Sequence, residues 1–155
     1  MAGTAMAEAM NGKLVPHPNR DDLRWELERI RKTARAVPGL PPEELRSVID
    51  PIVTFPRERF LPRAEAEEAA IYPKLARAFS RDVTTLLLFH HRLIERQAAE
   101  LAGADPREGA RLQELLYGLH GLIESHLARE RELYLRLLVL GDEATSAPEE
   151  EAAAA

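Results

Sequence analysis

The C-terminal third of the chain contains an apolar seam of helical period that two polar residues interrupt. From residue 105 to 140 the seam recurs at alternating steps of four and three, the spacing of one helix face. Its positions are Leu112, Leu116, Leu119, Ile123, His126, Glu130, Leu133 and Leu137. His126 and Glu130 lie one turn apart within this seam. The pattern predicts a long helix that buries a histidine and a carboxylate along with its leucines.

Composition extends the helical prediction to most of the chain. Leu, Ala, Glu and Arg dominate, and aromatic residues make up only 5% of the 155 residues, which is typical of helices and unlike sheets. Between proline and glycine signals, helices are predicted over residues 19–37, 42–79, 80–102 and 105–140. Pro51, Pro56 and Pro62 are expected to kink or break the second of these. Short connections favour an all-α, up-down antiparallel four-helix bundle.

The ends of the chain differ in composition from its centre. Residues 20–141 are predicted to form one domain, between a flexible arm at 1–19 and a disordered acidic and alanine-rich tail at 142–155. The tail accounts for the net charge of -5, so the neutral domain predicts no nucleic-acid or membrane partner. No apolar leader or transmembrane run occurs, which predicts a cytoplasmic protein. No pattern indicates a protein partner or homo-oligomer.

The pair of polar residues in the C-terminal seam is a candidate metal site. The chain has no cysteine, so any metal must be held by histidine, carboxylate or tyrosine. Burying the Glu130 carboxylate costs several kcal/mol unless something compensates it, and an ion that His126 also reaches would do so. The spacing alone is common in a glutamate-rich chain, and an ordinary buried polar pair is the competing interpretation.

Two further segments contribute candidate residues. Residues 63–75 align with residues 126–138, matching Glu67 with Glu130 and Arg63 with His126, which suggests a duplicated helix pair. In the third predicted helix, the seam favours His91 facing inward and places His90 on a flank. Tyr72 and Tyr134 are interpreted as packing residues at the edge of the core.

These residues carry a resemblance to a known family. The string FLPRAEAEE at 60–68, followed by IYP at 71–73, resembles the second helix of the hemerythrin-like, HHE cation-binding family. His91 and the block 126–130 fall where that family's third and fourth helices place their ligands. Over residues 20–140 the resemblance implies a four-helix bundle with a non-haem di-iron site. The metal ligands it implies are Glu67, His91, His126 and Glu130.

Two ligands expected from the resemblance are missing. The first predicted helix contains no histidine, and Arg63 stands where the second helix should supply one. In the family these two ligands serve mainly one iron, so an incomplete di-iron site is implied. One outcome is a single ion or an atypical pair on imidazole and carboxylate, which suit iron, zinc or manganese. The other is that no metal binds and the guanidinium of Arg63 pairs with Glu67 and Glu130.

Two functional hypotheses follow. The first is a metal-binding protein, with the roles in oxygen, nitric oxide, peroxide or iron handling that the resemblance implies. The second is a metal-free helical bundle that acts as an interaction or regulatory module. The sequence has no phosphate-binding loop and no distinctive nucleophile–base spacing, so no catalytic residue is predicted.

Overall fold

The computed structural model describes residues 20–146, which are almost entirely helical and contain no strand. The α-helices are α2 (Arg20–Ala36), α3 (Pro42–Phe55), α4 (Leu61–Ala70), α5 (Tyr72–Ala78), α6 (Arg81–Gly103) and α7 (Gly109–Ser146). Short turns of other helix types are η1 (Val37–Gly39) and η2 (Pro56–Phe60). The all-α prediction is confirmed. The predicted arm, 1–19, and residues 147–155 of the predicted tail lie outside the described residues.

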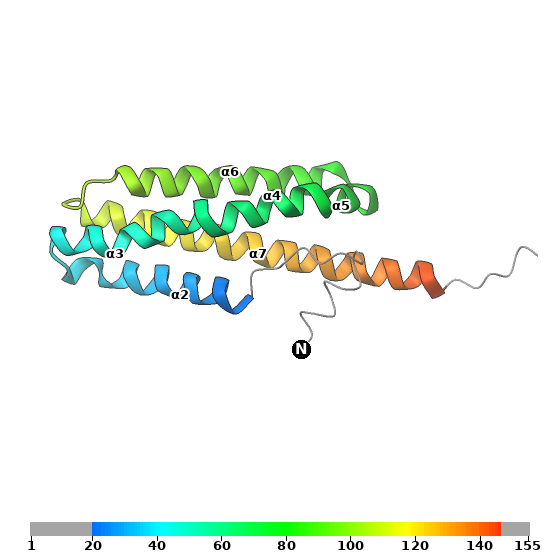
Figure 1. Cartoon of the computed structure of the whole chain (residues 1–155), viewed down its shortest axis with the longest axis horizontal. Coiled ribbons are helices and arrows are strands. Elements are labelled where there is room, and N and C mark those ends of the chain that lie inside the picture. The colour runs from blue at the N-terminus through cyan, green and yellow to red at the C-terminus, as the bar shows by residue number, and fades with distance from the viewer. Residues whose placement is uncertain (1–19, 147–155) are drawn as a thin grey trace, which may run out of the picture.

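The predicted second helix is divided into three α-helices and one π-type turn. In Figure 1, α3, α4 and α5 follow one another along a single row beside α6. Pro51 lies inside α3, while Pro56 opens η2, a wider π-type turn. Because proline lacks the N–H that an α-helix needs, a wider turn can absorb the missing hydrogen bond. A further break falls at Ile71, before Pro73, where none was predicted.

Two apolar clusters fill the space between the helices. The larger includes Ile30, Ile52, Phe60, Leu101 and Leu119, and the smaller consists of Ile71, Tyr72, Leu75, Leu87, Leu133 and Tyr134. The seam of α7 is buried as predicted from Leu112 to Leu133, whereas Leu137 is half-buried. Along α4, α6 and α7 the buried residues Glu67, His91, His126 and Glu130 fall between the two clusters in sequence. The polar group is therefore enclosed by apolar packing on both sides.

The C-terminal helix begins and ends later than predicted, at Gly109 and Ser146 instead of residues 105 and 140. α7 passes through Gly141, the expected stop, and ends at Ser146, so the predicted tail is helical over its first five residues. Glycine weakens a helix interior by about 1 kcal/mol relative to alanine, which does not by itself end a helix. Figure 1 shows α7 projecting beyond the other helices. Among the described helices, none is both long and apolar enough for a membrane crossing.

Candidate metal centre

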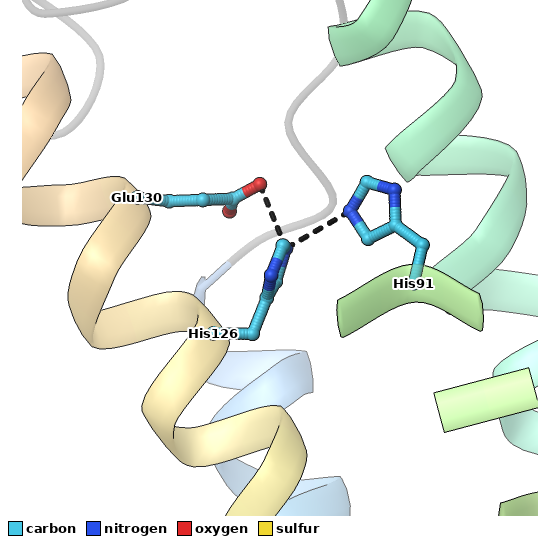
Figure 2. Close-up of side chains that lie close together, drawn as sticks. All are labelled: His91, His126 and Glu130. Atoms are coloured by element: carbon cyan, nitrogen blue, oxygen red, sulfur yellow. Dashed lines mark hydrogen bonds and ion pairs between the residues drawn. The ribbon is translucent and has the colours of Figure 1, made fainter. Parts of the chain in front are cut away.

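Three predicted ligands from α6 and α7 converge in the buried interior. His91, His126 and Glu130 are only 4%, 1% and 2% exposed. Figure 2 shows their side chains pointing toward one another. Nε2 of His126 lies 3.0 Å from Nε2 of His91 and 2.9 Å from Oε1 of Glu130. One donor atom from each of the three residues lies within 4.8 Å of the others, which is close enough for one ion to bind all three.

The fourth predicted ligand, Glu67, is buried on α4 but meets a different partner. Nη2 of Arg63 lies 2.9 Å from Oε1 of Glu67 and 3.2 Å from Oε2 of Glu130. The guanidinium therefore bridges the two acids, as the metal-free alternative anticipates. Glu67 is not part of the converging group formed by His91, His126 and Glu130 among the described residues.

Helix α2 contributes a buried acid of its own, but no member of the converging group. Glu26 is 3% exposed, and its Oε1 accepts a hydrogen bond of 2.9 Å from Nη1 of Arg59. Arg29 forms a second ion pair with the same carboxylate. The acid is thus occupied by arginines, and the described part of α2 supplies no histidine to the centre.

Burial and neighbouring charges push the pKa values of the two central acids in opposite directions. Burial, together with the nearby charge of Glu130, raises the pKa of Glu67 to about 9 even though Arg63 opposes the shift. Burial acts in the same direction on Glu130, but the hydrogen bond from His126 and the other partners lower its pKa to about 2. At neutral pH Glu67 therefore holds a proton, and the charge of Arg63 is balanced by Glu130.

A carboxylate on α4 fixes the protonation of His91. Nδ1 of His91 lies 2.6 Å from Oε1 of Glu68, so it donates its proton to that half-buried carboxylate. Burial lowers the pKa of His91 although the hydrogen bond to Glu68 opposes this. The imidazole is therefore neutral and directs the Nε2 lone pair at His126 and Glu130. A carboxylate behind a ligating histidine is the usual way to orient such a ligand.

Tyr72 also faces this group, contrary to the interpretation of it as an edge packing residue. Its hydroxyl is buried, donates to Oε1 of Glu130 at 3.0 Å, and lies 3.2 Å from Nε2 of His91. Burial and the charge of Glu130 raise the pKa of Tyr72 well above its usual value, so the free phenol keeps its proton. Tyr72 directly follows the break at Ile71, where α5 begins.

The remaining candidates lie outside the group of His91, His126 and Glu130. His90 is half-buried, with its ring 5.8 Å from that of His126, which agrees with a flank position. The Tyr134 hydroxyl is buried, and burial with the charge of Glu130 raises the pKa of this phenol. Phe60 contacts both site histidines edge-on, with ring centroids 6.1 Å and 5.6 Å from His91 and His126. This ring belongs to the larger apolar cluster and covers the polar group on that side.

The residues fit one metal ion and do not fit two. Three ligand atoms face a common point once Nε2 of His126 gives up the proton that it shares with Glu130, and Glu68 sets His91 in the tautomer that a ligand requires. A second ion would need Glu67 and the second oxygen of Glu130. Both acids are held by the guanidinium of Arg63, which carries a permanent charge and has no electron pair to offer a metal.

The described residues thus form an all-helical protein whose helices enclose a candidate metal centre of two histidines and a carboxylate. The family model described as Hemerythrin HHE cation binding domain matches residues 21–138. The chain belongs to the hemerythrin HHE cation-binding family, which confirms the resemblance and suggests metal binding. No match was found among curated proteins or solved structures.

Proposed function

We propose that this protein binds one non-haem iron ion through His91, His126 and Glu130, inside an up-down four-helix bundle whose second helix is the row α3–α4–α5. The convergence of these three buried donor groups is the observation that carries the proposal. Two histidines and one carboxylate form the ligand set typical of mononuclear non-haem iron(II) sites that keep open positions. The cation-binding character of the family agrees with this assignment.

Arg63 accounts for the single ion. Its guanidinium contacts both Glu67 and Glu130, so a fixed organic cation stands beside the acids that a second ion would need. Because like charges repel strongly in a buried site, binding a metal ion to the two carboxylates beside this guanidinium costs free energy. We therefore expect a stoichiometry of one ion per chain.

The chain's own groups prepare this site. Glu68 orients His91, Arg63 holds one oxygen of Glu130, and the ring of Phe60 excludes water from the side of the larger apolar cluster. When bound, iron would supply an open coordination position for a small molecule. The family resemblance suggests oxygen, nitric oxide or peroxide as that molecule, or a role in iron handling.

Metal analysis of protein purified without chelator tests the proposal. We expect about one equivalent of iron in the wild type and loss of iron in His126→Ala. The matched control is His120→Ala, which removes a half-buried histidine of the same helix outside the converging group. Failure to bind iron, zinc or manganese after anaerobic reconstitution would overturn the proposal, and two equivalents would overturn the role given to Arg63.

A metal-free interaction or regulatory module is the second candidate. It is favoured by the same arginine, because Arg63 already compensates the buried acids without any metal. In that case the wild type stays metal-free in the reconstitution above and keeps its folded helical content. A metal-loaded wild type would exclude this candidate.

A further inference from the structure

We propose that the phenol oxygen of Tyr72 is a fourth protein ligand of the ion. This inference rests on the proposed function, because it adds a ligand to the set of His91, His126 and Glu130. Tyr72 is the first residue of α5, so the segment α3–α4–α5 would also supply a ligand to the ion.

The geometry points to Tyr72 because its hydroxyl closes a ring of four atoms. The hydroxyl oxygen lies 3.2 Å from Nε2 of His91, which lies 3.0 Å from Nε2 of His126. Nε2 of His126 lies 2.9 Å from Oε1 of Glu130, and this oxygen lies 3.0 Å from the Tyr72 hydroxyl. Each of the four residues offers one atom, and each atom has two of the others as neighbours.

These separations match those expected between neighbouring ligands of one metal ion. Bonds of about 2.0–2.1 Å place neighbouring ligand atoms about 3.3 Å apart in a tetrahedron and about 2.9 Å apart at right angles. The four observed edges, from 2.9 to 3.2 Å, fall within this range. The phenol oxygen is therefore as well placed as the three histidine and carboxylate donors.

The side chain of Tyr72 is held in this position from several directions. Its ring stacks on that of His91, with centroids 5.8 Å apart and planes 23° from parallel, and the residue is only 4% exposed. The ring of Phe60 packs edge-on against His91 and His126. On binding of the ion the phenol proton leaves to solvent and the oxygen takes the bond, as cations deprotonate coordinating side chains.

A purely structural role for Tyr72 makes different predictions. As a hydrogen-bond donor to Glu130, it would support the fold but would not interact electronically with the ion. Tyr134 supplies the matched control, because it is a second buried tyrosine of the same apolar cluster. Its hydroxyl is buried but makes no hydrogen bond to His91, His126 or Glu130 among those described. Tyr72→Phe and Tyr134→Phe therefore each remove one buried hydroxyl, the first inside the ring of four ligand atoms and the second outside it.

The decisive measurement is the visible spectrum of full-length protein loaded with ferric iron. Phenolate bound to ferric iron absorbs visible light by charge transfer, whereas histidine and carboxylate ligands alone give no such band. We expect the band in the wild type and in Tyr134→Phe, and its loss in Tyr72→Phe. Bound ferric iron without the band in the wild type, or a band that persists in Tyr72→Phe, would overturn the proposal.

Zinc affinity gives a second readout that is independent of iron redox state. Tyr72→Phe should raise the dissociation constant for Zn²⁺ at least about tenfold, a loss typical of disturbed metal centres. Tyr134→Phe should leave it unchanged. Equal affinities in both variants would overturn the ligand role of Tyr72 alone. If the wild type binds neither iron nor zinc, the proposed function itself fails, and the two failures are thereby distinguished.

Discussion

Arg63 and Glu130, on α4 and α7, form an ion pair across the interior of the protein, with Nη2 of the arginine 3.2 Å from Oε2 of the glutamate. The two residues are 67 positions apart in sequence. Arg63 also holds Glu67 one turn away on its own helix. This arrangement places a permanent positive charge between the two buried carboxylates of Glu67 and Glu130. We therefore expect the arginine to limit the number of ions that the centre can hold.

Replacing Arg63 with histidine should increase the metal content. The substitution removes the fixed cation and offers an imidazole one turn from Glu67, so a second ion gains both charge balance and a ligand. We expect Arg63→His to rise from about one toward two equivalents of iron, measured by elemental analysis after anaerobic reconstitution.

Arg63→Lys is the control for this change, because it keeps the positive charge and adds no ligand. This variant should remain at one equivalent or less. An Arg63→His protein that binds no more iron than Arg63→Lys would show that the arginine does not limit the stoichiometry.

Removing Glu68 should weaken metal binding without unfolding the protein. Its carboxylate accepts the Nδ1 proton of His91 and so keeps Nε2 free to coordinate. Disruption of such an outer partner typically costs about 10–100-fold in metal affinity. We expect Glu68→Ala to show this loss by titration calorimetry with Zn²⁺, and Glu68→Gln to recover part of it.

The matched control is Glu65→Ala, which removes an exposed carboxylate from the same helix. Its affinity should equal that of the wild type, and all three variants should retain the wild-type helical circular dichroism. The positioning role would be wrong if Glu68→Ala and Glu65→Ala bound zinc equally well.

The metal-free protein should lose stability as pH rises through the neutral range. Glu67 has its pKa raised from 4.5 to about 9 by burial first and by Glu130 second. Between these values the folded protein holds a proton that the unfolded chain has released, so the free energy of unfolding falls with increasing pH. One such proton gives a slope of at most about 1.4 kcal/mol per pH unit.

Urea unfolding of chelator-treated protein at pH 6, 7, 8 and 9 measures this slope. Glu67→Gln keeps the shape of the side chain but cannot titrate, so its stability should vary less over the same range. The exposed Glu65→Gln should keep the wild-type slope. Parallel profiles for wild type and Glu67→Gln would show that Glu67 is not protonated in the folded protein.

The C-terminal helix illustrates how much the sequence determined. The alternating steps of four and three predicted a helix with Leu112, Leu119 and Leu133 inward, and these residues are buried. His126 and Glu130 followed the same period and are buried as well. Period is a local property, since one turn of helix fixes which side chains share a face. The family resemblance likewise depended on local strings, and the match over residues 21–138 confirms it.

Tyr72 and Glu68 show what only the tertiary structure decided. Both contact His91, from 19 and 23 residues away, and neither was predicted to face the site. Tyr72 is the first residue of α5 and packs against residues of α6 and α7 in the smaller apolar cluster. A helical period predicts the face of one unbroken segment. The angle across a break, and the register between helices, are set by the side chains that fill the space between them.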